Sequence, residues 1–189
     1  SQYLQAVGAA LSCVYRGTDE VSYVGGGEGS TSEGEFFEAI NWAAREKLPT
    51  IFCIQNNRFA ISVPIEQQTA GGSVYKVVQG FEGIHKFHID GTDFLESYAT
   101  AKEAVKLARN GEGPSFIYAD VVRLRSHSAS DSQDKYRSKE AIEKDMLKDP
   151  IAKLEKQLVS RGIMTEEEIA ATRKELNDLV IKSAEEAYA

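Results

Sequence analysis

The sequence predicts an α/β protein whose core is a three-layer, doubly wound parallel sheet with C-terminal helices. Short apolar runs alternate with helical apolar periods between residues 21 and 122. The run Thr50–Ile54 is apolar on both faces, which is typical of a central parallel strand. Repeated βα alternation favours helices on both faces of such a sheet. A chain of 189 residues is long enough to build one core.

The first predicted elements surround a glycine-rich segment. Residues 2–15 are small and apolar and predict a helix, and Val21–Val24 predicts a short strand. The strand breaks into Gly25–Gly29, where glycines allow a sharp turn. A helical apolar period then runs to Leu48 and ends before Pro49. This part therefore reads as helix, strand, glycine loop and helix.

Three further strands are expected. Thr50–Ile54 is followed by the polar segment Gln55–Phe59, and a third strand covers Gly83–Ile89. A helix over Phe94–Arg109 leads to a fourth strand over Pro114–Val122. Ligands of such sheets bind beyond the carboxyl ends of the strands, so we expect functional polar residues there.

The rest of the chain predicts a loop and charged helices. Ser126–Arg137 is polar and lacks periodicity, so it is expected to be a surface loop. Amphipathic helices are expected at about Lys139–Ser160 and at Glu166–Tyr188. We therefore divide the chain into a binding domain at 1–138 and a helical extension of it at 139–189.

Charge and hydropathy argue against several classes of protein. The net charge of −7 argues against a nucleic-acid or membrane-surface protein, since both use dense positive charge. The apolar runs are far shorter than the roughly 20 residues of a membrane helix. Cys13 and Cys53 lie in apolar surroundings and are expected to be buried thiols in a reducing cytoplasm. The sequence starts inside a helix without a cap, so we expect site residues upstream of Ser1.

Polar residues follow three of the predicted strands, at 27–34, 56–59 and 123–128. The first segment offers a glycine loop and a helix start, which can hold phosphate oxygens, and it carries Glu28. A carboxylate, the Asn57 amide oxygen and a loop carbonyl form an all-oxygen set that suits Mg²⁺. Glycines alone are weak support, since the loop matches neither common nucleotide-binding pattern.

The spacing of these segments is similar to that of a known family. Gly27-Glu28-Gly29 with Asn57, 29 residues after Glu28, resembles the thiamine diphosphate motif that begins Gly-Asp-Gly and ends in Asn. The whole chain resembles the alpha part of the decarboxylating component of 2-oxo acid dehydrogenase complexes. Further matching motifs are Gln5–Ala10, Ser32–Gly34, Asn56–Ser62, Asp90–Asp93, Ser126–Asp131 and Tyr136-Arg137.

The resemblance implies a thiamine diphosphate-binding fold and a set of ligands. By this likeness Glu28, the Asn57 side chain and the Phe59 main-chain carbonyl would hold Mg²⁺. Gly29 and Ser30 would meet the diphosphate through backbone N–H groups.

The resemblance also assigns roles to Arg123 and His127. Arg123 looks like the family's diphosphate arginine, and this role fits its chemistry, since a guanidinium forks onto phosphate oxygens. His127 looks like the catalytic histidine beside the thiazolium and the 2-oxo acid, and it counts as cofactor-binding too. His85 and His88 are expected to be ordinary strand residues.

Four loop residues keep alternative roles. Arg125 and Arg137 either order the loop or touch phosphate. Ser128 and Ser130 stand where some family members are phosphorylated, which would add negative charge near an anionic substrate or carrier.

The function implied by the resemblance is oxidative decarboxylation of a 2-oxo acid, with thiamine diphosphate as electron sink and transfer of the acyl group to a lipoyl-bearing acyltransferase. Glu28 in place of the usual Asp resembles the branched-chain (2-oxoisovalerate) type. A beta part, fused or separate, would supply the activating glutamate in a heterotetramer. Alternatives are a pyruvate or acetoin dehydrogenase component, a transketolase-like enzyme, or a non-catalytic assembly module that keeps the fold.

Overall fold

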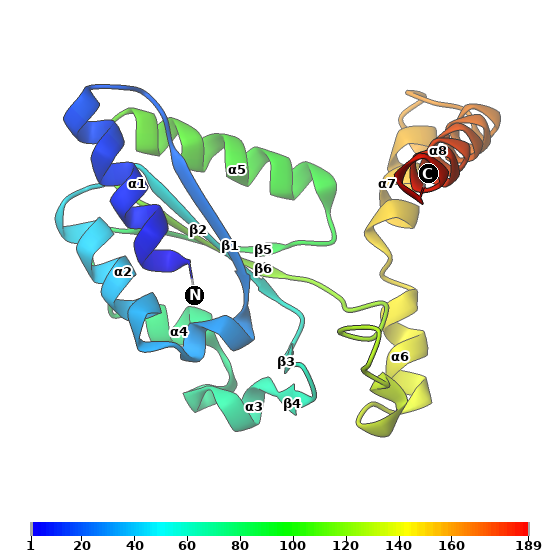
Figure 1. Cartoon of the computed structure of the whole chain (residues 1–189), viewed down its shortest axis with the longest axis horizontal. Coiled ribbons are helices and arrows are strands. Elements are labelled where there is room, and N and C mark those ends of the chain that lie inside the picture. Colours follow the sequence, from blue (N-terminus) through cyan, green and yellow to red (C-terminus); the bar gives the residue numbers. More distant parts are fainter. Residues whose placement is uncertain (1, 189) are drawn as a thin grey trace. The chain divides into compact units, whose positions relative to one another are not determined.

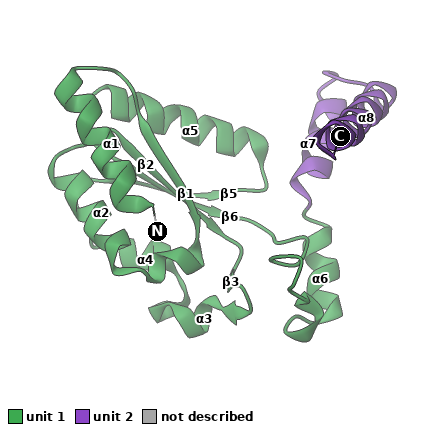
Figure 2. Ribbon diagram, viewed as in Figure 1, with its two compact units in different colours: residues 1–148 green, residues 149–189 purple. Residues whose placement is uncertain are grey.

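The computed structural model describes residues 2–188, which form two compact units (Figure 2). Unit 1 spans residues 1–148 and unit 2 spans residues 149–189. The sequence-based division at 138/139 falls earlier than this boundary, so the first of the C-terminal helices lies in unit 1. Neither Cys13 nor Cys53 forms a disulfide, and Cys53 is only partly buried.

Unit 1 is built on a parallel sheet of four strands (Figure 1). Their order across the sheet is β1 (Ser22–Gly27), β2 (Thr50–Asn56), β6 (Ser115–Asp120) and β5 (His85–Asp90). The register places Asn56 directly beside Asp120 at the carboxyl ends of β2 and β6. All four expected strands are present, and the predicted parallel sheet is confirmed.

Alternate residues of the strands pack into two apolar clusters, one on each face of the sheet. Phe52 of β2 and Phe116 of β6 pack with α1 (Tyr3–Arg16), α2 (Gly34–Arg45) and α4 (Val74–Val78). Ile51 and Ile117, one position along, pack on the other face against α5 (Phe94–Arg109). Because both faces of β2 are covered, its run is apolar throughout. Figure 1 shows α5 on the opposite side of the sheet from α1 and α2, which confirms the three-layer class.

A segment of short elements that the sequence did not predict lies between β2 and β5. It contains the short hairpin β3 (Phe59–Ala60) and β4 (Val63–Pro64), then α3 (Ile65–Gln68), the 3₁₀ turn η2 (Ala70–Gly72) and α4. These pieces are too short for an apolar period to develop, so periodicity could not detect them. The hairpin and α3 contact η1 (Glu28–Ser32), the 3₁₀ turn that follows β1.

The prediction of one helix over 139–160 is wrong. Instead α6 (Lys139–Met146) ends, and α7 (Pro150–Ser160) begins anew. Asp149 caps α7 by accepting a hydrogen bond from the Ile151 N–H at 2.9 Å, and Pro150 cannot donate to a continuing helix.

Unit 2 consists of α7 and α8 (Glu166–Tyr188), the latter with the predicted bounds. The two helices are joined by an ion pair in which Arg173 donates to Glu155. Within residues 2–188, no helix is long and apolar enough to cross a membrane.

Candidate functional site

Glu28 is a buried carboxylate at the carboxyl end of β1. It opens η1, and its side chain has no solvent exposure. One carboxylate oxygen, Oε2, accepts a hydrogen bond from the Asn57 backbone N–H at 3.2 Å. The other oxygen, Oε1, is buried and has no hydrogen-bond partner among the described residues. Burial raises the pKa of Glu28, although backbone N–H groups and the charge of Arg123 oppose this shift.

The turn Asn56–Phe59, which follows β2, lies against this carboxylate. Asn57 Oδ1 accepts a hydrogen bond from the Phe59 N–H at 3.2 Å. Arg58 adopts a left-handed conformation with φ of 69°, which reverses the chain into β3. The structure therefore brings Glu28 and Asn57 into direct contact and places Phe59 two residues further along the same turn.

The glycine loop is packed closely against its neighbours. Ser30 Oγ donates to the Gly27 carbonyl at 2.6 Å and accepts from the buried Tyr3 hydroxyl at 2.6 Å. A Cβ at Gly29 would lie 2.8 Å from the Cβ of Ala60 in β3. Only glycine fits at Gly29 without displacing the hairpin, so the backbone of η1 can approach β3.

Gln68 of α3 is a site residue that the sequence analysis missed. Its Nε2 donates to the Glu28 carbonyl at 2.9 Å and to Ser32 Oγ at 3.1 Å. These two hydrogen bonds join α3 to η1, next to the buried Glu28 carboxylate. A glutamine in a four-residue helix carries no sequence signal for such a role.

Arg123 lies beside the same turn, three residues after β6. Its guanidinium donates to the Ile61 carbonyl and to the Tyr136 hydroxyl, both at 2.6 Å. The guanidinium carbon also stands 5.4 Å from the centre of the Phe59 ring, which is cation–π distance. The structure thus groups Arg123 with Glu28, Asn57 and Phe59.

Within residues 2–188, the hydrogen bond that connects His127 to this group comes from its backbone. The His127 N–H donates to Asp131 Oδ2 at 2.8 Å, and the same oxygen accepts from the Tyr136 hydroxyl at 2.6 Å. The His127 side chain is exposed. Its catalytic role, inferred from resemblance alone, stays a prediction.

Arg137 holds the loop that carries these residues. Its buried guanidinium donates to the Arg123 carbonyl at 2.9 Å and to Asp145 of α6 at 2.5 Å. Of the two roles left open for Arg137, this geometry favours ordering of the loop. Arg125 is exposed and gains no assignment.

The residues of this site fit a hard cation and a diphosphate. A buried carboxylate oxygen without a partner is costly, and a metal ion would satisfy it. Nearby Asn57 and Phe59 add an amide and a carbonyl oxygen, which are Mg²⁺-type ligands. Within residues 2–188, no three His, Cys, Asp or Glu side chains form a metal cluster. The candidate set contains one carboxylate, so it differs from such clusters.

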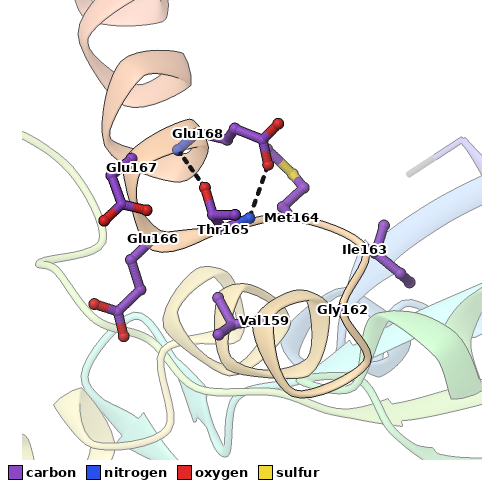
Figure 3. Close-up of a pocket in the computed structure, with 8 residues that line it drawn as sticks. All are labelled: Val159, Gly162, Ile163, Met164, Thr165, Glu166, Glu167 and Glu168. Atoms are coloured by element: carbon purple, nitrogen blue, oxygen red, sulfur yellow. Dashed lines mark hydrogen bonds between the residues drawn. The ribbon is translucent and has the colours of Figure 1, made fainter.

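A separate pocket lies within unit 2. It has a volume of about 410 Å³ and is lined by residues from the end of α7, the turn that follows it and the start of α8 (Figure 3). In the figure, Thr165 and Glu168 exchange two hydrogen bonds, which form a capping box at the start of α8. None of the residues predicted for the functional site lines this pocket, whose lining includes the carboxylates of Glu166, Glu167 and Glu168.

Comparison with known families classifies the chain. The family described as "Dehydrogenase E1 component" matches residues 1–189. The chain therefore belongs to the dehydrogenase E1 component family, and the resemblance noted in the sequence is confirmed.

The relatives of the chain include both branched-chain and pyruvate types. The chain is 38% identical over 187 residues to the 3-methyl-2-oxobutanoate dehydrogenase subunit alpha of Mycobacterium tuberculosis, covering 95% of this chain and 51% of that protein. It is 37% identical over 192 residues to the pyruvate dehydrogenase E1 component subunit alpha of Bacillus subtilis, covering 100% and 51%. It is 36% identical over 187 residues to the 2-oxoisovalerate dehydrogenase subunit alpha of the same species, covering 99% and 56%. The chain thus spans about half the length of these relatives.

Among solved structures, a putative thiamin diphosphate-dependent enzyme from Mycobacterium smegmatis is similar with a TM-score of 0.49 and 30% identity. The match covers 62% of this chain and 21% of that one.

Proposed function

We propose that the chain is part of the alpha component of a thiamine diphosphate- and Mg²⁺-dependent 2-oxo acid dehydrogenase of the branched-chain type. The observation that carries this proposal is the Glu28 carboxylate, which is buried at a strand end with Oε1 unpartnered and with Asn57 in contact. Burial of an uncompensated charged carboxylate is unfavourable, and a cation beside Oε1 would stabilise the ionised form of Glu28.

The residues of this chain would divide the binding work. Glu28 Oε1, Asn57 Oδ1 and the Phe59 carbonyl would hold the metal ion, and the backbone N–H groups of Gly29 and Ser30 would meet the diphosphate. Arg123, already aligned over the Phe59 ring, would exchange one of its present partners for a phosphate oxygen. Thiamine diphosphate, when bound, supplies the nucleophilic carbon and the electron sink for decarboxylation.

His127 would act at the reacting end. Its exposed imidazole can donate a hydrogen bond to the substrate carboxylate or carbonyl. Asp131 fixes the backbone of His127, so the ring is carried on an anchored loop segment. We assign substrate orientation and acyl transfer to a lipoyl carrier to this residue.

The branched-chain assignment depends on Glu28. The named relatives include both branched-chain and pyruvate types at similar identity, so identity does not choose between them. Glutamate in place of aspartate is the feature that favours a branched-chain 2-oxo acid over pyruvate. The remaining partners in this proposal are a beta part, which would complete each site in a heterotetramer, and a lipoyl-bearing acyltransferase.

A substrate panel tests the proposal. The full-length alpha protein, assembled with its beta part, is assayed with 3-methyl-2-oxobutanoate, pyruvate and acetoin at fixed thiamine diphosphate and Mg²⁺. The highest kcat/KM is expected for 3-methyl-2-oxobutanoate. A preference for pyruvate or acetoin would overturn the substrate assignment, and no turnover with any of them would favour a non-catalytic module.

A further inference from the structure

A chain of side-chain hydrogen bonds crosses the carboxyl ends of three neighbouring strands. Asn56, the last residue of β2, donates through Nδ2 to Asp120 Oδ1 at 2.7 Å. His88 of β5 donates through Nε2 to the other oxygen, Asp120 Oδ2, at 2.8 Å. The two bonds hold both oxygens of the Asp120 carboxylate, which is the last residue of β6.

The hydrogen bond that Asn56 Nδ2 donates to Asp120 fixes the orientation of the Asn56 amide. Asn56 Oδ1 accepts a hydrogen bond from the Arg58 N–H at 3.1 Å. If the amide flipped, its NH₂ group would face the Arg58 N–H and its oxygen would face a carboxylate. Asp120 accepts only, so it selects the orientation in which Asn56 Oδ1 caps Arg58.

The capped residue is the one that bends the Asn56–Phe59 turn. Arg58 is left-handed with φ of 69°, a conformation disfavoured for residues that carry a Cβ. The Asn56 cap compensates for this strain by satisfying the Arg58 N–H, as in other Asx turns. On either side of Arg58 stand Asn57, which contacts Glu28, and Phe59.

We propose that Asp120 is a positioning residue for the metal-binding turn. Through Asn56 it holds Arg58 in its left-handed conformation and so fixes the positions of its two neighbours, Asn57 and Phe59, in the turn that contacts Glu28. His88 steadies Asp120 by occupying its second oxygen, with its ring packed 4.9 Å from the Tyr75 ring. This inference rests on the proposed function, because it assumes that the turn binds a cation.

The pairing of these strands does not depend on the side-chain hydrogen bonds of Asn56, Asp120 and His88. The strand ends are already joined by backbone bonds, from the Val121 N–H to the Asn56 carbonyl at 2.9 Å and from the Gly91 N–H to the Asp120 carbonyl at 2.8 Å. The side chains of Asp120 and His88 are each 44% exposed, so truncating Asp120 opens no cavity in the core. The energetic effect of Asp120 should therefore be concentrated in the turn.

Three variants test the inference in the full-length alpha protein assembled with its beta part. Asp120→Ala removes both bonds, whereas Asp120→Asn keeps an oxygen for Asn56 Nδ2 and should rescue the turn. Asp19→Ala is the control, because it removes another exposed carboxylate, which lies 3.8 Å from Arg109 Nε. Two readouts are compared: backbone hydrogen exchange of Arg58 without ligand, and the dissociation constant of thiamine diphosphate at saturating Mg²⁺.

We expect Asp120→Ala to speed Arg58 exchange and to weaken thiamine diphosphate binding, each by about tenfold or more, since a hydrogen bond to a charged group is lost. Asp120→Asn and Asp19→Ala should stay within about threefold of wild type, well below that tenfold step. Unchanged exchange or unchanged affinity in Asp120→Ala would overturn the inference, as would equal losses in Asp120→Asn. If the wild type itself does not bind thiamine diphosphate, the proposed function fails, and Arg58 exchange alone decides whether Asp120 holds the turn.

Discussion

Replacing Glu28 by Gln should have opposite effects on stability and on metal binding. The glutamine can still accept the Asn57 N–H through its carbonyl oxygen, so the contact with the turn is kept. What changes is the charge on the buried oxygen that has no partner within residues 2–188. The substitution therefore separates the electrostatic role of Glu28 from its packing role.

The expected magnitudes follow from the burial of this carboxylate. An unsatisfied buried polar group costs about 1–3 kcal/mol, and more if charged. Because the amide of the variant has its own N–H groups to satisfy, we expect a net gain of about 1 kcal/mol in the free energy of unfolding of the metal-free protein. Loss of a charged ligand, worth about 1.5–3 kcal/mol, should weaken Mg²⁺ binding about 10- to 150-fold.

The stability gain should depend on pH with a definite sign. Burial raises the pKa of Glu28 in the folded state above its ordinary value of 4.5. Below pH 4.5 the carboxyl is protonated in both states, and its contribution to stability is fully present. As the pH rises through the folded-state pKa, the folded protein loses the bound proton and this contribution disappears. The amide introduced by Glu28→Gln does not titrate, so the advantage of the variant should be near zero below pH 4.5 and should reach its maximum once the pH exceeds the folded-state pKa of Glu28.

Urea unfolding in EDTA at a series of pH values, followed by circular dichroism, measures this difference. A parallel Mg²⁺ titration measures the affinity. A Glu28→Gln variant that is less stable than wild type at the alkaline end of the series, or whose advantage is independent of pH, would show that the buried charge carries no penalty.

Further substitutions probe packing, loop order and ligand contacts. Gly29→Ala should lower stability by about 1–3 kcal/mol, because its Cβ would lie 2.8 Å from a methyl group of β3, whereas Gly34→Ala meets nothing within 4 Å and serves as the control; equal melting temperatures would contradict this. Arg137→Ala should lower the free energy of unfolding by about 2–3 kcal/mol, a moderate loss because its partner Asp145 on α6 is partly exposed to solvent. The variant should also speed proteolysis of the loop over 126–137, and unchanged cleavage would argue that Arg137 does not anchor this loop. Arg123→Ala should weaken thiamine diphosphate binding, whereas His127→Ala should leave that affinity nearly intact and reduce turnover about 10²- to 10³-fold; normal turnover in the second variant would leave His127 as a simple loop residue.

Long apolar patterns predicted the architecture of unit 1 well. The strand Thr50–Ile54 and the helix Phe94–Arg109 could be located because burial on two faces and on one face leaves different periods in the sequence. Local propensity could not reveal the hairpin at Phe59–Pro64, because its strands have only two residues each and β3 contacts η1, which is distant in the sequence. The break before Pro150 was missed because the helical charge pattern continues across it.

The sequence could predict contacts between site residues at the ends of paired strands, but it could not predict contacts that depend on how the loops fold. Contact between Glu28 and Asn57 follows from parallel pairing of β1 with β2, which places both at one edge. Gln68 and Asp120 were missed, because each acts by fixing another residue and neither stands in a recognisable pattern. The place of the His127 ring depends on loop folding, which sequence spacing does not determine.

Calorimetric titration of the assembled protein with thiamine diphosphate, with and without Mg²⁺, tests most directly whether Glu28 and the Asn56–Phe59 turn form a cation site, and it is carried out for the wild type and for Asn57→Ala. We expect the wild type to bind thiamine diphosphate only when Mg²⁺ is present and Asn57→Ala to bind at least about tenfold more weakly, because one amide ligand is lost. Equal affinity with and without the metal, or unchanged affinity in Asn57→Ala, would contradict a cation site built from Glu28 and the Asn56–Phe59 turn.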